Sequence, residues 1–316
     1  GILKFTMLLL LAYFIGLFAA SKERRPAREF FTDFQITTGW SNGLPFLTAP
    51  NGSNWGFSCL DAIVHIAEEI PRPSVNIPKA LMLTIAVGFF TGLPIIFVFG
   101  FCMTDLDTQY SALTTLYEVF GQKKAAAIGY QVTLFFSTVG AMWGIHVWQS
   151  RLAWTIGLNK EFPFARHLGK VHGAPFHTPI WALMWSAGFT GLCSFVYVAS
   201  ETAFNPLVAA GILFQYISYA IPLILLLRHR RSKVAHGPFW YPRLGLLANI
   251  VFLSWAPVAL LIYCFPYAFP VVTGDMNYVS VVLIIVFLII VCFWFSFARK
   301  SFSFPKLGSH RSVALL

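Results

Sequence analysis

Four ionisable residues lie close together in one short apolar stretch of the sequence. Asp61, His65, Glu68 and Glu69 are spaced at i, i+4 and i+7 or i+8, so on a helix they would share one face. Ionisable groups inside a membrane segment are costly and usually mark a substrate or ion pathway. The same spacing also suits a helix that lies at the membrane surface with its carboxylates in water. The spacing alone leaves both interpretations open.

This stretch and the rest of the sequence lack the common catalytic motifs. Glu69 follows His65 at the position where the zinc motif H-E-x-x-H requires a second histidine. The histidines at 167, 172 and 177 recur every five residues in a loop, a spacing that suits no single helical face. No G-x-S-x-G, P-loop or dinucleotide fingerprint occurs in the sequence. We therefore expect no metal, no cofactor and no enzymatic activity.

A run of small and polar residues comes directly before these ionisable groups. It reads Trp55-Gly56-Phe57-Ser58-Cys59-Leu60-Asp61, where a membrane span would continue as an apolar helix. Unwound backbone at membrane depth is tolerated only where it lines a cavity or is buried in protein, and transporters use such breaks to bind substrates and ions. The run predicts a break in the helix within residues 55–61.

The elements that must position this segment are membrane spans. Of the 316 residues, 57% are hydrophobic and 11% charged, whereas soluble domains carry about 25% charged residues. Seven apolar runs are long enough to cross a bilayer, near residues 2–20, 80–103, 125–148, 179–199, 203–227, 244–266 and 278–297. With the polar stretch near residues 55–70, we predict an all-α integral membrane protein of about eight transmembrane helices.

The net charge of +10 comes from basic residues that lie in short clusters between the apolar runs, as expected of loops between membrane spans. This distribution does not indicate a nucleic-acid-binding surface. In the eight-span topology, sixteen of the 22 Lys and Arg residues fall on one side. The positive-inside rule then predicts that both ends of this chain are cytoplasmic, although the basic loop at residues 21–28 lies on the other side. The same topology places the glycosylation triplet at Asn51 outside.

Several motifs of the sequence resemble those of fungal amino-acid permeases. The closest group is the amino-acid/choline transporter branch, which includes GABA and choline permeases, within the amino acid–polyamine–organocation superfamily. The resemblance covers nearly the whole chain. It rests on Gly56-Phe57-Ser58-Cys59-Leu60-Asp61-Ala62, His65-Ile66-Ala67-Glu68-Glu69-Ile70-Pro71-Arg72-Pro73, Ile77-Pro78-Lys79-Ala80, Asn159-Lys160-Glu161-Phe162-Pro163-Phe164, Gly237-Pro238-Phe239, Gly245, Asn249, Phe265-Pro266-Tyr267 and Asp275-Met276-Asn277-Tyr278.

The resemblance implies a transporter fold of twelve spans, ten of them in two inverted five-helix repeats (the LeuT-like fold). Residues 1–316 would then form a single transmembrane permease domain made of spans five to twelve, with the polar segment as the sixth. In the family, substrate is held between the broken first and sixth spans. We therefore expect that only the sixth-span half of the substrate site lies in this chain.

Residues of the site follow from the same resemblance. The substrate-binding candidates are Trp55, Gly56, Phe57, Ser58, Cys59 and Asp61, with Trp55 able to stack on a substrate ammonium. The gating or coupling candidates are His65, Glu68 and Glu69. Ser137 and Thr138 would line the pathway, although such hydroxyls also bond their own helix. The family usually carries Gly at the position of Cys59, where a side chain resists the positive φ that Gly permits.

The implied function is secondary active transport of an amino acid or a related amine, such as GABA or choline, across the plasma membrane. The partners would be the small-molecule substrate, the lipid bilayer and, by the family's habit, protons, for which Asp61 or Glu68 are the ionisable candidates. A different interpretation is a truncated, transport-inactive remnant or a regulatory partner of a full-length permease. An intramembrane enzyme would need a nucleophile and a base on facing spans, and no such pair is recognisable in the sequence.

Overall fold

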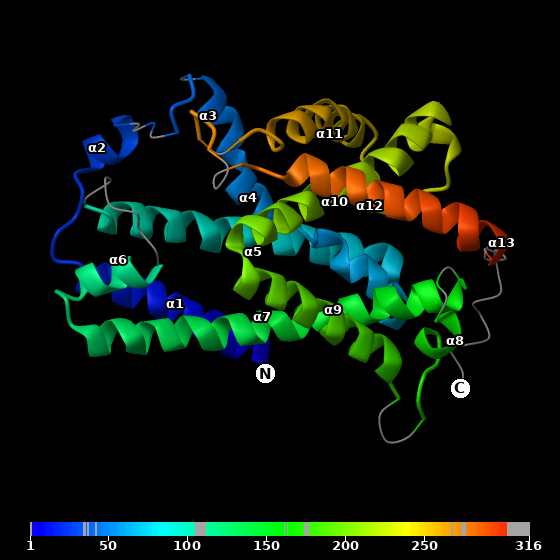
Figure 1. The fold of residues 1–316 in the computed structure, drawn as a ribbon, viewed down its shortest axis with the longest axis horizontal. Coiled ribbons are helices and arrows are strands. Elements are labelled where there is room, and N and C mark those ends of the chain that lie inside the picture. Colours follow the sequence, from blue (N-terminus) through cyan, green and yellow to red (C-terminus); the bar gives the residue numbers. More distant parts are fainter. Residues whose placement is uncertain are drawn as a thin grey trace. The chain divides into compact units, whose positions relative to one another are not determined.

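The computed structural model describes residues 2–33, 36, 38–41, 43–104, 112–160, 162, 164–173, 177–266, 268–272 and 276–301 (Figure 1). Glu161, Pro163, Tyr267 and Asp275 of the sequence motifs lie outside these residues, as does the side chain of Glu68. The described residues are helices and connecting segments without a strand, which confirms the predicted all-α class.

Among the residues that the structure describes, six helices are long and apolar enough to cross a membrane. They are α5 (Pro73–Cys102), α7 (Lys124–Leu158), α9 (Ile180–Ala199), α10 (Glu201–Arg228), α11 (Pro242–Ile262) and α12 (Val279–Phe293), which continues through a π-helical turn, η4 (Trp294–Ala298). Helix α1 (Ile2–Ala20) covers the first predicted span. The remaining helical segments are α2 (Ala27–Thr32), α3 (Gly43–Thr48), α4 (Pro50–Gly56), η1 (Leu60–Glu69), α6 (Ala112–Val119), α8 (Ala165–Leu168), η2 (Arg231–Lys233) and α13 (Arg299–Ser301).

Two helices extend well beyond the apolar runs that predict them. Helix α5 begins at Pro73 rather than near residue 80, because proline lacks the N–H that the first helical turn leaves unpaired anyway. Helix α7 continues ten residues past Trp148 and ends at Leu158. Hydropathy marks where a span contacts lipid, whereas the helix itself ends where capping and turn residues end it.

The described residues form two compact units. The first comprises Gly1–Thr37 and Lys79–Ile145, and the second comprises Thr38–Pro78 and His146–Leu316, so the division falls inside α5 and α7. In the first unit, Tyr13 and Leu17 of α1 pack with Leu116 of α6 in one buried cluster. In the same unit, the ring of Phe30 in α2 stacks on that of Phe101 in α5, with centroids 4.6 Å apart.

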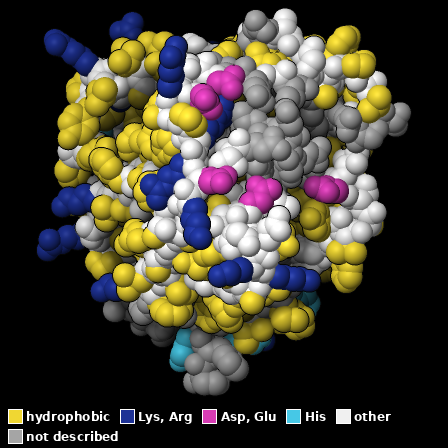
Figure 2. All heavy atoms as spheres, turned by 90° about the vertical axis from the view of Figure 1, so that its left-hand side faces the viewer, with side chains coloured by type: hydrophobic (Ala, Val, Ile, Leu, Met, Phe, Trp, Pro, Cys, Tyr) yellow, Lys and Arg dark blue, Asp and Glu magenta, His cyan; other side chains and the backbone are white. Residues whose placement is uncertain are grey.

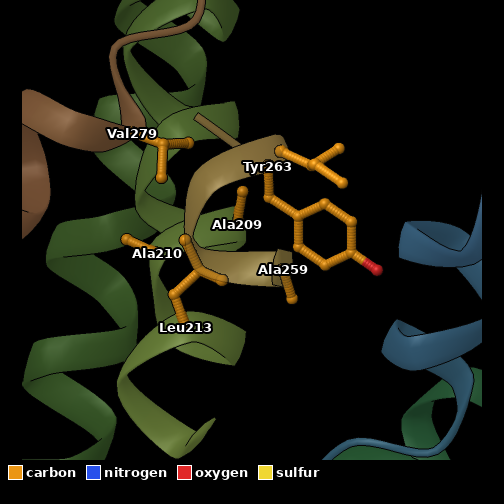
Figure 3. Packing of buried hydrophobic residues seen from close by; sticks show 7 residues of the cluster. Ala209, Ala210, Leu213, Ala259, Tyr263 and Val279 are labelled. Carbon is orange, nitrogen blue, oxygen red and sulfur yellow. The ribbon is translucent and has the colours of Figure 1, made fainter. Parts of the chain in front are cut away.

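The core of the second unit lies where α10 packs against α11 and α12. Ala209 and Ala210 of α10 lie beside Ala259 of α11, and Leu213 and Val279 complete the contact (Figure 3). Small side chains at a helix contact let the backbones approach closely, which is how helices associate when lipid removes the hydrophobic driving force between them.

A buried asparagine joins the end of α11 to the beginning of α12. The Asn277 amide donates to the carbonyl oxygens of Tyr263 (2.7 Å) and Phe265 (2.9 Å). Its oxygen accepts from the backbone N–H of Val279 at 3.2 Å. One side chain thus satisfies two carbonyls after α11 and one of the unpaired N–H groups that open α12.

Large hydrophobic side chains lie on the surface of the spans. At most 22% of the most apolar window of any of the six spans is buried within the described residues. Figure 2 shows hydrophobic side chains spread across one face of the molecule, with few acidic groups among them. A surface of this kind is far too apolar for water and suits the hydrocarbon of a bilayer.

Replacing Asn277 by Ala should destabilise the protein by about 2 kcal/mol, because two buried carbonyls lose their donor. The measurement is thermal unfolding of the purified protein in detergent. Asn76→Ala is the control, since its side chain makes an exposed hydrogen bond to the carbonyl of Pro71. Equal midpoints for the two variants would show that Asn277 does not hold the α11–α12 connection.

Candidate functional site

The polar segment is a broken helix in the second unit. Helix α4 ends at Gly56, and the backbone turns at Phe57 (φ −108°, ψ 14°) and Cys59 (φ 58°, ψ 25°). The chain then resumes as 3-10 turns, η1 (Leu60–Glu69), which are interrupted by a kink at Ile66 (φ −109°, ψ 18°). The interruption therefore lies at residues 57–59, within the run 55–61 where the sequence predicts a break, whereas Gly56 still belongs to α4.

Cys59 adopts the left-handed conformation that a side chain disfavours. Left-handed backbone costs an L-residue about 1–2 kcal/mol relative to the right-handed form, and Gly avoids this cost. From the sequence, Cys is expected to resist this conformation. The structure nevertheless places Cys59 at φ 58°, so the surrounding contacts override the local preference.

Asp61 is tied to the neighbouring helix α10. Its Oδ1 accepts a hydrogen bond from Nε2 of Gln215 at 3.1 Å, and the same amide also donates to the hydroxyl of Tyr219 at 2.8 Å. On the other side, Oδ2 of Asp61 lies 3.4 Å from Nε2 of His65. The side chains of Asp61 and His65 are 31% and 30% exposed.

His65 and Glu69, the other two ionisable residues of the segment whose side chains are described, contact α7. The ring of His65 stacks on that of Trp148, with centroids 5.9 Å apart and planes 20° apart. Oε1 of Glu69 lies 2.7 Å from Nε of Arg151, and Arg151 is mostly buried, with 19% of its side chain exposed. Asp61 and Glu69 thus each have a protein partner, although 54% of the Glu69 side chain remains exposed.

A small cavity of about 180 Å³ lies beside the break. Two of its lining residues, Phe57 and Ser58, belong to the predicted substrate-binding set. The other four members, Trp55, Gly56, Cys59 and Asp61, do not line it, and 46% of Trp55 is exposed. The full lining is Asn54, Phe57, Ser58, Leu60, Ile212, Gln215, Tyr216, Tyr219 and Phe252.

Three polar groups around the break are absent from the sequence-based site. Gln215 and Tyr219 lie one turn apart in α10, and the amide of Gln215 donates both to Asp61 and to the hydroxyl of Tyr219. Asn54 donates to the hydroxyl of Tyr263 at 2.5 Å and so connects α4 to the end of α11. A glutamine in the middle of an apolar span is a detectable signal, because uncompensated polar groups are costly there.

Two predicted pathway residues, Ser137 and Thr138, bond the carbonyls of their own helix. Ser137 donates to Thr133 (3.2 Å) and Thr138 to Leu134 (2.7 Å). Both belong to the first unit, and their lining role stays a prediction.

Asn51 is the second residue of α4, and its side-chain oxygen is buried without a partner in the described part of the chain. Its glycosylation also stays a prediction.

One contact resembles the nucleophile and base pair that is not recognisable in the sequence. Nδ1 of His146 in α7 lies 3.3 Å from Oγ of the buried Ser186 in α9. Within the described residues neither side chain bonds a carboxylate that would orient the imidazole. Without that third group the pair lacks the arrangement of a catalytic triad, and we interpret it as a polar contact between two spans. The described residues also contain no group of metal-ligating side chains.

Comparison with known proteins identifies the family. The model of the family described as "Amino acid permease" matches residues 1–291. The chain is 49% identical to the swainsonine transporter of Arthroderma benhamiae over 92% of its length, and 46% identical to a transmembrane transporter of Metarhizium robertsii over 91%. It is 34% identical to the choline transporter of Saccharomyces cerevisiae over 87% of its length.

These matches cover only part of each relative. The chain spans 58% of the length of the first two transporters and 50% of the choline transporter. The resemblance to permeases and the expectation that the chain is no enzyme are both confirmed, because the family model and the relatives are those of transporters. The chain, an integral multi-pass membrane protein, belongs to the amino acid permease family.

Proposed function

We propose that the protein containing this chain is a secondary active transporter of amino acids or related amines, and that the break at residues 57–59 is this chain's part of the substrate site. The observation that carries the proposal is the cavity beside the break, where Phe57 and Ser58 lie with polar and aromatic residues of α10. Broken membrane helices expose backbone N–H and C=O groups at mid-span, and transporters use these groups to bind substrates.

The cavity wall suits an organic amine. The rings of Phe57, Tyr216, Tyr219 and Phe252 offer faces that attract an ammonium group. The nitrogens of the Asn54 and Gln215 amides already donate to protein groups, so their amide oxygens are what they offer to donor groups of the substrate. The relatives named for transport of choline and of 7-keto 8-aminopelargonic acid support an amine-bearing substrate, because choline carries a quaternary ammonium and the second compound an amino group.

Asp61 and His65 suit a coupling role, and the pair of Glu69 with Arg151 suits a gate. Asp61 joins η1 to α10, whereas His65 and Glu69 join η1 to α7. Protonation of Asp61 would remove the charge that strengthens its bonds to Gln215 and His65, and so would loosen η1 from α10. We place the protein in the plasma membrane with both ends of this chain in the cytoplasm, as the distribution of basic residues favours.

Cysteine labelling tests the substrate site. In a variant that retains cysteine only at position 58 (Ser58→Cys), a small charged thiol reagent should react, and choline or an amino acid mixture should slow the reaction severalfold by occupying the cavity. A variant that keeps only Cys292, exposed on α12, is the control and should stay unreactive if that surface faces lipid. Complete inertness at position 58 would indicate a packed helix without a substrate pathway.

Uptake tests the role of Gln215. Gln215→Leu should lower amine uptake at least tenfold, because Asp61 and Tyr219 both lose their donor in a poorly hydrated site. Tyr219→Phe keeps the ring and should cost less. Uptake is measured in cells expressing the full reading frame that contains this sequence, normalised to the amount of protein in the membrane. Unchanged uptake by Gln215→Leu would refute the proposed site, and no uptake by the parent protein would favour a transport-inactive role.

Reporter fusions test the orientation. A reporter inserted after Arg231 should be active on the cytoplasmic side, and one inserted near Asn51 on the external side, as the positive-inside rule predicts. Asn51→Gln should also remove any glycosidase-sensitive shift in mobility. The reverse pattern of reporter activity would overturn the orientation while leaving the substrate site untouched.

A further inference from the structure

The segment that connects α10 to α11 carries the densest positive charge of the described chain. Within residues 228–243 lie five Arg or Lys residues and two histidines, and the sequence has no acidic residue between Glu201 and Asp275. The five cations are Arg228, Arg230, Arg231, Lys233 and Arg243. A helical span ends at one side of this segment and the next begins at the other.

One of the five cations has a structural role. The guanidinium of Arg231 lies 4.8 Å from the ring centre of Trp240. Its Nη1 also donates to the Asn249 side-chain oxygen at 2.7 Å, with the Asn249 amide oriented so that its nitrogen bonds the carbonyl of Gly245. A side chain at position 245 would collide with this guanidinium, which explains a glycine there. Arg231 therefore fixes η2 against the first turns of α11.

The other four cations are free to meet a partner. Arg228, Arg230, Lys233 and Arg243 are exposed, and none has an ion pair or side-chain hydrogen bond in the part of the chain that the structure describes. Arg228 is the last residue of α10, and Arg243 lies in the first turn of α11. Because α10 and α11 are packed spans, these charges lie at the depth where the spans leave the hydrocarbon.

Two aromatic rings mark the same depth. Phe239 and Tyr241 are 45% and 55% exposed, and their rings meet edge to face with centroids 5.0 Å apart. Exposed aromatic rings at the end of a span are typical of residues that sit among lipid headgroups. A soluble anionic partner would explain the charges alone, whereas a lipid explains the charges and the exposed rings together.

We propose that this surface, formed by Arg228, Arg230, Lys233, Arg243, Phe239 and Tyr241, binds the headgroups of anionic phospholipids of the surrounding bilayer. Clusters of Lys and Arg directly beside a membrane span attract such lipids over zwitterionic ones. Because Arg231 holds η2 on α11, the four free cations are presented from a fixed backbone. The proposal depends on the membrane spans and does not rest on the substrate site.

Native mass spectrometry of the detergent-purified protein tests the proposal, with phosphatidylserine and phosphatidylcholine titrated separately. The quadruple variant R228Q/R230Q/K233Q/R243Q should lose at least tenfold in apparent affinity for phosphatidylserine and should bind phosphatidylcholine unchanged. The matched control K22Q/R28Q/K123Q/K124Q removes the same charge from exposed positions of the first unit and should lose less than threefold. Thermal unfolding checks that both variants are folded.

Two outcomes would overturn the proposal. Equal losses in the two quadruple variants would show that net charge alone attracts the lipid, and no loss in either would show that the loop does not bind it. If the loop variant fails to fold, the unmutated protein is tested instead, with the salt concentration raised from 50 to 500 mM. Phosphatidylserine binding should then fall severalfold more than phosphatidylcholine binding, and an equal response would also refute the proposal. Competition by inorganic phosphate at millimolar concentration would indicate a site for a free anion instead of a lipid.

Discussion

A hydrocarbon environment leaves no water to pair with backbone N–H and C=O groups, and this constraint governs the broken segment on which the site is built. At the break the chain satisfies part of this demand locally. The N–H of Phe57 donates to the carbonyl of Ser53 at 3.3 Å, and that of Ser58 to Trp55 at 3.1 Å. The N–H of Ala62 then donates to Cys59 at 3.1 Å. The interruption is therefore a hydrogen-bonded turn, in contrast to a frayed helix end.

Side chains at three positions along the segment connect it to neighbouring helices. Asn54 bonds Tyr263 at the end of α11, Asp61 bonds Gln215 in the middle of α10, and Glu69 pairs with Arg151 in α7. Each anchor connects a different helix, so the segment cannot shift without breaking a polar contact. Any movement of this segment must exchange these partners for others.

Hydropathy along the sequence predicted the spans and the break, but it did not predict which side chains pack against the broken segment. The apolar runs marked the spans, and the polar run from Trp55 to Asp61 marked the break. The helix partners were not predictable in this way, because nothing in the spacing of Asp61, His65 and Glu69 tells which neighbouring helix supplies Gln215 or Arg151. Arg151 shows the limit well. It follows the apolar run at residues 125–148, where hydropathy ends the span, yet it lies within α7 and is mostly buried beside Glu69.

Cys59 shows which force determines the break. If local preference set the geometry, a residue with a side chain would turn away from φ 58°, and the helix would run on through this position. The observed turn means that the anchors on either side, Asn54 before it and Asp61 after it, together outweigh a cost of about 1–2 kcal/mol. A glycine here would remove that cost without changing the anchors. The broken geometry is thus a property of the packed helices, and Gly at this position in relatives would ease it but is not required to produce it.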